Sequence, residues 1–191
     1  MAYIGLAKPY IAKLKSQTTS PEGVTTPVYE NGFKCGKAIT VNITPNYNEA
    51  KLYADNTLSE YAKEFKDGTI KLGTDRLPKQ AQGVVFSHEV SEDGKTVKYK
   101  TGDNANYVGV GFYMEEMLDG EKQYVAIVVY KSKFTEAAMD YETKGENITF
   151  KTPSIEGSIS ALDDTQWKIT KVFDTELEAE NFVKTTLNIT E

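Results

Sequence analysis

Alternating apolar and polar residues run through most of this chain and predict extended strands. The clearest example is KAITVNIT at 37–44, where Ile39, Val41 and Ile43 share one face and polar residues occupy the other. Further strands are predicted at 3–14, 47–54, 57–66, 107–117, 121–132, 146–152, 154–161 and 166–174. The strand at 121–132 contains the unbroken apolar run YVAIVVY, which indicates burial on both faces. About ten strands with few helices favour an antiparallel β-sandwich.

Glycines and short polar residues mark the turns between these strands. Asp67-Gly68, Asp93-Gly94 and Asp119-Gly120 each predict a tight hairpin turn, because both residue types tolerate the positive φ that such turns need. Asp55-Asn56 predicts another turn, since both side chains can bond to the nearby backbone. Pro9 fits the first predicted strand only at a sheet edge or at a β-bulge. The segments on either side of Asp119-Gly120 form the best-defined predicted hairpin.

Helical periodicity is clear only towards the end of the sequence, at 175–187. Thr175 and Glu178 form a capping box, which predicts that a helix begins there. The apolar face of this helix is formed by Ala179, Phe182, Val183, Thr186 and Leu187. A short helical connection is also predicted at 76–82, so the expected fold is mainly β with a flanking α-helix.

One long segment shows no regular pattern. Residues 16–33, SQTTSPEGVTTPVYENGF, are rich in serine, threonine, proline and glycine, which predicts a long, mobile loop. Loops of this length are uncommon inside compact domains unless they have a function. We therefore expect 16–33 to be a functional arm of a single domain that spans 1–191.

Composition narrows the classes of partner. The chain has 191 residues, enough to bury a core, and its net charge of −6 argues against binding to nucleic-acid phosphates. Cys35 is the only cysteine, so no disulfide can form within the chain and a reducing compartment is expected. The longest apolar run, 124–130, is far too short to cross a bilayer, and the N-terminus does not resemble a signal peptide. No membrane partner is expected.

The residues give little sign of catalysis, and we expect no enzyme activity, cofactor or metal. His88 is the only histidine, which excludes paired-histidine metal sites, and we interpret it as structural. A nucleophilic pair of Cys35 with His88 is conceivable but lacks other signature residues. Gly109 and Gly111 lie in a predicted strand and do not open a helix. They indicate close approach by another group, not a dinucleotide site.

Carboxylates gather in KLYADNTLSEYAKEFKDG at 51–68, and their spacing is not that of a calcium loop. Glu60 and Glu64 have helical spacing, but in a helix they would repel each other, so we favour a strand with both on one face. A carboxylate pair for glycoside hydrolysis stays open from the sequence. The favoured interpretation is a turn followed by a negatively charged strand face.

The order of these segments resembles the major tail protein family, the tail tube proteins of long-tailed non-contractile phages of Gram-positive bacteria. The resemblance covers nearly the whole chain. It rests on the opening IGLAKPYIAKL, the loop ending TTPVYENG, the segment ITVNITPNYNEAKLYADN, the hairpin YVGVGFYMEEMLDGEKQYVAIVVYKSKF, the segment ENITFKTPSIEGSI and the terminal helix FDTELEAENF.

The resemblance implies a structural virion protein of the phage tail, assembled in the host cytoplasm. Six β-sandwich subunits would close into a ring with a continuous inner β-barrel, and stacked hexameric rings would form a hollow tube. The tube would enclose the tape measure protein and contact tail terminator and baseplate or distal tail proteins. DNA would pass through the lumen without specific binding. A phage-tail-like bacteriocin would fit the same pattern.

Two groups of residues acquire expected roles within such a tube. The segment 16–33 would become ordered on contact with the next ring. Its expected interface residues are Pro21, Val24, Pro27, Val28, Tyr29 and Phe33. An acidic lumen would repel DNA phosphates. Its expected lining residues are Glu60, Glu64, Glu115 and Glu116, although the same charges could instead lie on the outer surface.

The main alternative is a carbohydrate-binding or adhesin-like β-sandwich. Twelve tyrosines and Trp167 could supply rings on which sugars stack. Against this alternative, the tyrosines are scattered through predicted strands at spacings typical of a core. Assembly separates the two functions, because a tube protein forms long particles whereas a sugar-binding module stays small.

Overall fold

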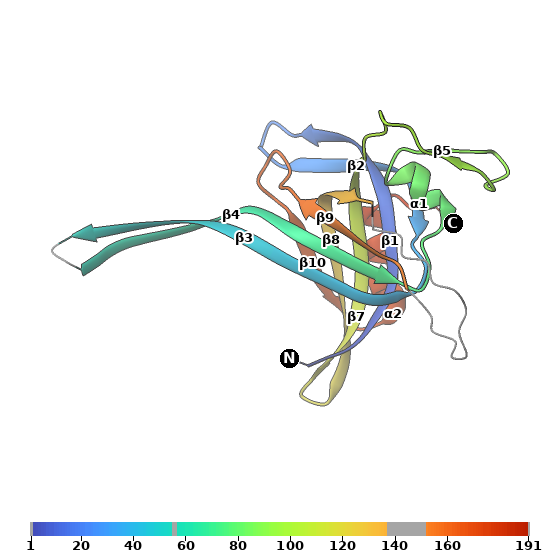
Figure 1. Cartoon of the computed structure of the whole chain (residues 1–191). Helices are drawn as coiled ribbons and strands as arrows, with labels where there is room; N and C mark the ends of the chain where they lie inside the picture. The colour runs from blue at the N-terminus through green and yellow to red at the C-terminus, as the bar shows by residue number, and fades with distance from the viewer. Residues whose placement is uncertain (1, 55–56, 137–151, 191) are drawn as a thin grey trace, which may run out of the picture.

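The computed structural model describes residues 2–54, 57–136 and 152–190, and it is mainly β with antiparallel strands and a C-terminal helix, as predicted (Figure 1). The strands are β1 (Ala2–Thr19), β2 (Thr25–Lys34), β3 (Ala38–Ala54), β4 (Thr57–Thr74), β5 (Glu89–Val90), β6 (Val97–Lys98), β7 (Tyr107–Leu118), β8 (Glu121–Thr135), β9 (Ser154–Ile159) and β10 (Lys168–Phe173). The helices are α1 (Lys79–Val84) and α2 (Glu176–Thr186). Residues 146–151 of one predicted strand lie outside the described residues.

One large sheet folds over on itself to make the body of the subunit. Its strand order is β2-β1-β7-β8-β9-β4-β3, and β10 also pairs with β8. The sheet divides at β8, because residues 124–129 pair with β10 whereas residues 132–135 pair with β9. Strands β9, β4 and β3 therefore cross over the layer that contains β1, β7 and β8 (Figure 1). The inner core between these layers includes Ile11, Phe33, Ile70, Leu72 and Ile159.

A second core lies between the other face of the β1–β7–β8 layer and α2. Strand periodicity divides the side chains between the two cores, since successive residues point to opposite faces. Val110 of β7 and Val129 of β8 belong to the inner core, whereas Tyr113 and Val128 pack towards α2. The prediction that the strand at 121–132 is buried on both faces is confirmed.

Gly109 and Gly111 of β7 lie directly beneath α2, where a side chain would not fit. A Cβ atom at Gly109 would lie 2.6 Å from Tyr29 Cε1 and 2.7 Å from Leu187 Cδ2. A Cβ atom at Gly111 would lie 2.5 Å from Val183 Cγ1. The prediction that these glycines allow close approach is confirmed, and the approaching groups are Tyr29 of β2 and the C-terminal end of the terminal helix.

The terminal helix begins and packs as its capping and periodicity predict. Thr175 is the N-cap, and its Oγ1 accepts a hydrogen bond from the Glu178 backbone N–H at 3.3 Å. Ala179 and Val183 are buried against the sheet, and Leu187, the C-cap residue, is buried with them.

Pro9 lies at a β-bulge, which was one of the two predicted positions for it. The register of β1 with β7 shifts between Ala7 and Tyr10, and Lys8 has a positive φ of 42°. The bulge brings Lys8 into an ion pair with Glu180 of α2, and the Tyr10 hydroxyl donates to the same carboxylate at 2.6 Å. Burial opposes the charge of Glu180, but hydrogen bonds from Lys8, Tyr10 and Lys184 lower its pKa to about 2.

The prediction of a mobile loop at 16–33 is wrong. These residues complete β1 and form most of β2, which pair as an antiparallel hairpin around a short turn at Gly23. Thr25, Tyr29 and Phe33 are buried. The composition was misleading, because threonine suits strands and most polar residues of this segment remain exposed in a half-buried hairpin.

The Asp-Gly pairs do not all form turns. Asp93-Gly94 lies between β5 and β6, and Asp119-Gly120 joins β7 to β8 with positive φ at both residues, as predicted. Asp67-Gly68, by contrast, lies inside β4, so its predicted turn is wrong. Beside this pair β4 has a β-bulge at Lys66, and its pairing with β3 continues on the other side of the bulge. Asp55-Asn56, the turn predicted between β3 and β4, lies outside the described residues.

The remaining connections agree with the predicted types. The helical connection predicted at 76–82 is α1, and it adds Ala81 and Val84 to the inner core. The strands predicted at 154–161 and 166–174 are β9 and β10.

Candidate assembly surface

The β3–β4 hairpin extends well beyond the body of the subunit (Figure 1). Strand β9 pairs with β4 only from Gly68 to Gly73. Residues 46–54 and 57–67, which we call the arm, pair only with each other among the described strands. An isolated two-stranded ribbon is marginally stable in water, so the arm is the part of this fold that most needs a partner.

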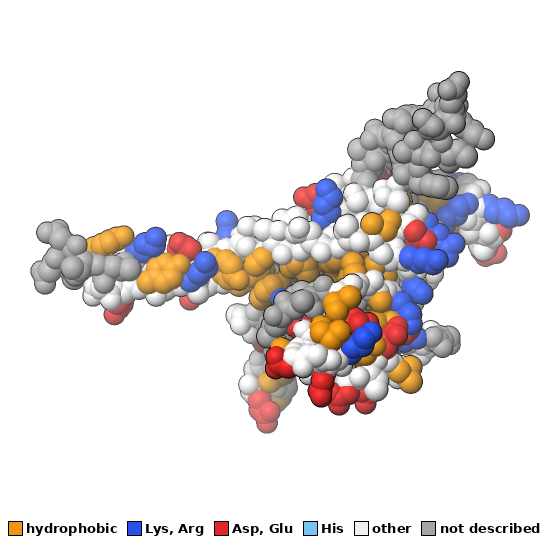
Figure 2. All heavy atoms as spheres, turned by 90° about the horizontal axis from the view of Figure 1, so that it is seen from below, with side chains coloured by type: hydrophobic (Ala, Val, Ile, Leu, Met, Phe, Trp, Pro, Cys, Tyr) orange, Lys and Arg blue, Asp and Glu red, His pale blue; other side chains and the backbone are white. Residues whose placement is uncertain are grey.

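Strand alternation gives the arm two chemically different faces. The aromatic face consists of Tyr47, Glu49, Lys51, Tyr53, Tyr61, Lys63 and Phe65. The acidic face consists of Asn48, Ala50, Leu52, Glu60, Ala62 and Glu64. Figure 2 shows hydrophobic side chains continuing from the body out along the arm.

A β-bulge at Lys66 joins the aromatic face to the inner core. On the body side of the bulge, Ile43 pairs with Ile70; Ile70 belongs to the inner core, and the partly buried Ile43 packs against it. On the arm side, Tyr47 pairs with Phe65, because Lys66 is an extra residue in β4. If Lys66 were instead paired in regular alternation, the β4 side chains of the arm would point to the opposite face. The bulge therefore keeps the aromatic side chains on the side that the body buries.

The base of the aromatic face packs against the body. Phe65 stacks on Trp167 with ring centroids 4.6 Å apart and an interplanar angle of 2°, and Tyr47 meets Phe65 edge-on at 6.4 Å. Lys168 lies 4.8 Å from the Trp167 ring centroid. Trp167 is thus committed to internal packing, which weakens its proposed role as a sugar-stacking platform.

Further along the arm, polar groups on the aromatic face pair with one another while the rings stay accessible. Glu49 and Lys63 form an ion pair at 3.2 Å, and the Lys63 ammonium lies 4.5 Å from the Tyr47 ring centroid. Hydrogen bonds from Tyr61 and Lys63 lower the pKa of Glu49. Even so, 44 % of Tyr47, 48 % of Tyr61 and 63 % of Tyr53 remain exposed. Exposed aromatic residues in a row are typical of an interaction surface.

The acidic face carries two uncompensated charges. Glu60 and Glu64 are exposed and share this face, as predicted for a strand. Neither carboxylate forms an ion pair with any residue that the structure describes. Whether they line a lumen depends on assembly and stays a prediction.

The other two acids expected in a lumen lie on β7, outside the arm. Glu115 is paired with Lys122 at 2.8 Å. Glu116 is only 5 % exposed, so the prediction that it faces a lumen is wrong for the subunit as folded. Adjacent strand residues point to opposite faces, and the sequence offered no sign of which one the subunit would bury.

The two end strands of the main strand order, β2 and β3, differ in how their outer edges are protected. No described strand pairs with the outer side of β3, which leaves a 17-residue edge open. On the edge of β2, the Thr25 N–H donates to Asp164 at 2.8 Å, and the Asn188 amide donates to the Tyr29 carbonyl at 3.1 Å. Pro27 lies between Thr25 and Tyr29, and its backbone nitrogen faces the same outer side as theirs. The N–H that proline lacks therefore removes no hydrogen bond between β1 and β2.

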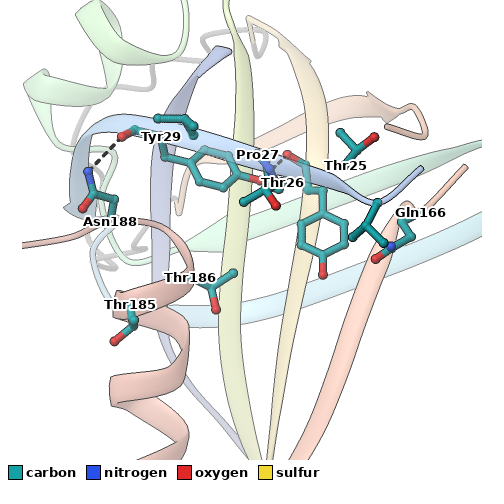
Figure 3. Close-up of a pocket in the computed structure, with 11 residues that line it drawn as sticks. Thr25, Thr26, Pro27, Tyr29, Gln166, Thr185, Thr186 and Asn188 are labelled. Atoms are coloured by element: carbon teal, nitrogen blue, oxygen red, sulfur yellow. Dashed lines mark hydrogen bonds between the residues drawn. The ribbon is translucent and has the colours of Figure 1, made fainter. Parts of the chain in front are cut away.

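Most of the residues predicted as a ring interface lie on or beside β2, and Figure 3 shows Pro27 and Tyr29 among them. Val24, Pro27, Val28 and Tyr29 help to line a cleft of about 580 Å³ beside α2. The interface prediction is wrong for Tyr29 and Phe33, because both are buried in their own subunit. Val24 and Val28 are exposed, and Pro21 is exposed in the preceding turn.

His88 is held between two carboxylates, Asp103 at 2.7 Å and Glu136 at 2.5 Å. Burial opposes a charge on the ring, but these two acids raise the pKa of His88 above its usual value. With both ring nitrogens engaged, the imidazole cannot activate Cys35. Burial also raises the pKa of Cys35 to about 12, so this thiol is not a nucleophile near neutral pH.

Among residues 2–54, 57–136 and 152–190, no group of three histidine, cysteine or acidic side chains could hold a metal ion. Neither helix in that part of the chain is long and apolar enough to span a membrane. Comparison of the sequence with protein-family models and with curated proteins gave no significant match.

Proposed function

We propose that this protein is a tail tube subunit of a long-tailed non-contractile phage. In this proposal six copies close into a ring, and the rings stack into a tube that encloses the tape measure protein and later conducts DNA. The protein is then part of the virion tail, is assembled in the host cytoplasm, and contacts tail terminator and baseplate or distal tail proteins at the tube ends.

The observation that carries the proposal is the contrast between the body, whose core is buried within the subunit, and the arm, whose aromatic face and strand edge are not covered. The arm has no third strand among the described residues, its aromatic face is half exposed, and the β3 edge beside it is open. A second copy is a fitting partner for such an edge, because closure of a ring removes edges that would otherwise cause uncontrolled aggregation.

Charge supports the proposed passage of DNA. Six copies with a net charge of −6 give a ring a formal charge of about −36. Glu60 and Glu64, which form no ion pair within the described part of the chain, are suited to a wall that repels phosphates. Screening restricts this repulsion to about 8–10 Å, so the acids must line the lumen itself to have an effect.

Electron microscopy and light scattering of the purified chain test the proposal directly. The concentrated protein is expected to form rings or tubes of constant diameter. A matched variant replaces residues 48–64 with Asn-Gly, which joins Tyr47 to Phe65 through a tight turn. This variant is expected to fold with an intact body and remain monomeric.

Two results would contradict the proposal. One is a full-length chain that stays monomeric at every concentration, alone or with other tail components. The other is an arm-shortened variant that assembles as well as the full-length chain. Specific glycan binding by a monomer would instead support the adhesin-like alternative.

A further inference from the structure

The side of the β3–β4 hairpin that forms the inner core does not end where the body ends. Val41 and Ile43 lie on this side within the body, and Tyr47 continues it into the arm. On β4, the bulge at Lys66 preserves the same alignment from Ile70 to Phe65. Within the body, this side is covered by the opposite layer of the sandwich. At the base of the arm Phe65 is still covered by Trp167, but beyond it Tyr47, Tyr53 and Tyr61 stay exposed.

We propose that a second copy of this chain covers the aromatic face of the arm, while the acidic face stays in contact with water. This inference rests on the proposed tube assembly and adds the orientation of the arm within it. The second copy then supplies the layer that the opposite half of the sandwich supplies in the body.

The chemistry of the two faces favours this orientation over its reverse. Burial of Tyr47, Tyr53 and Tyr61 removes aromatic surface from water, and their neighbours Glu49 and Lys63 are already paired. Burial of the acidic face would desolvate Glu60 and Glu64, because the lysines of the arm pair with Glu49 and Asp67 instead. A contact surface is therefore expected on the aromatic side.

Charge also favours a copy of the same chain as the partner. The aromatic face carries Lys51, Lys63 and Glu49, a formal charge of +1, whereas the whole chain carries −6. Subunits that meet through this face bring a locally basic patch against an otherwise acidic protein. The opposite orientation would place Glu60 and Glu64 against that acidic surface.

Single-cysteine labelling can determine which face is covered. Cys35 is buried and has a raised pKa, so it provides little background reaction with maleimide. Ala50 and Lys51 are adjacent, exposed and on opposite faces, so Lys51→Cys reports on the aromatic face and Ala50→Cys is its matched control. Each variant is mixed with an excess of wild-type chain, so that assembly does not depend on the labelled subunit.

Both thiols are expected to react at similar rates in free subunits. In assembled particles, labelling of Lys51→Cys is expected to slow by about tenfold or more, while Ala50→Cys changes little. Equal protection of both thiols, protection of Ala50→Cys alone, or protection of neither would overturn the orientation and leave the tube proposal standing. Absence of any assembly would remove both proposals together.

Discussion

Two long hairpins of this protein are buried to very different extents. The β1–β2 hairpin is packed into the body, and its outer edge is capped by Asp164, Asn188 and the proline at position 27. The β3–β4 hairpin leaves the body and keeps an open edge and an aromatic face. The comparison teaches that alternation shows which face a strand needs to bury, but not which molecule buries it.

The hairpins also differ in how each tyrosine is used. Tyr29 of β2 is 2 % exposed, and its hydroxyl donates to the Tyr130 carbonyl at 2.7 Å. Tyr61 of the arm is half exposed. The same residue type therefore contributes to folding in one hairpin and, in our proposal, to association in the other.

The largest expected difference is that between removal of the Tyr29 ring and removal of the Tyr61 ring. Tyr29→Ala is expected to lower the free energy of unfolding of the monomer by about 3–5 kcal/mol, because it leaves a cavity and an unpaired carbonyl. Tyr61→Ala is expected to change it by less than about 0.5 kcal/mol but to weaken assembly. Urea unfolding and light scattering measure the two effects, and similar destabilisation by both changes would contradict the contrast.

Next in size is the link between the β1 bulge and α2. Glu180→Ala is expected to cost about 2–3 kcal/mol, because Lys8 and Tyr10 lose a shared acceptor. Glu178→Gln is the matched control on the exposed side of the same helix and is expected to cost a few tenths of a kcal/mol. Urea unfolding near neutral pH compares the two variants.

Acid titration probes the same contact. The pKa of Glu180 is lowered to about 2 in the folded chain, so its stabilisation is complete above the unfolded value near 4.5. The contribution is expected to fall as the pH decreases from about 4.5 towards 2, and to be missing from the pH dependence of Glu180→Ala. If the free energies of unfolding of the wild-type chain and of Glu180→Ala fell in parallel with decreasing pH, the Glu180 carboxylate would contribute nothing to stability.

A smaller effect is expected from removing the caps on the β2 edge. Asn188→Asp keeps a residue that tolerates the positive φ of 51° but loses the donor to Tyr29, at a cost of about 0.5–1.5 kcal/mol. Asp164→Ala removes the acceptor for Thr25 and is expected to cost a similar amount. Irregular aggregation of the double variant, seen by light scattering, would show that the caps close this edge. Unchanged solubility would show that Pro27 alone is sufficient.

The smallest effect on the monomer is expected from the acidic face. Replacement of Glu60 and Glu64 with lysine is expected to change the free energy of unfolding by less than about 0.5 kcal/mol, because both side chains are exposed and unpaired. Tubes should still form, but particles that carry both changes should deliver DNA poorly. Normal infectivity of such particles would contradict the proposed acidic lumen.

Several features followed from local physical chemistry and could be predicted from residues alone. Alternation at Ile39, Val41 and Ile43 predicted a strand, and Thr175 with Glu178 predicted the start of α2. Gly109 and Gly111 predicted a close approach, although only the packed chain shows that Tyr29 and α2 make it. In each case the determining interaction lies within a few residues or in the size of one side chain.

Other features depended on contacts between distant segments. The composition of 16–33 predicted a loop, yet pairing with β1 and packing of Tyr29 and Phe33 made it a strand. Asp67-Gly68 predicted a turn, but continued pairing of β3 with β4 carried the strand past it. Long-range pairing outweighed local turn preference at both places.

By itself, then, the sequence determined the strand-rich class, the capped terminal helix, the Asp119-Gly120 hairpin and the alternation that gives each strand a face to bury. Only the tertiary structure decided that Glu116 is buried, that the β2 edge is capped, and that the β3–β4 hairpin extends beyond the body with its aromatic face uncovered. The reason is physical. Local patterns follow from bonds and side-chain sizes close along the chain, whereas burial depends on which distant surfaces the folded chain brings together.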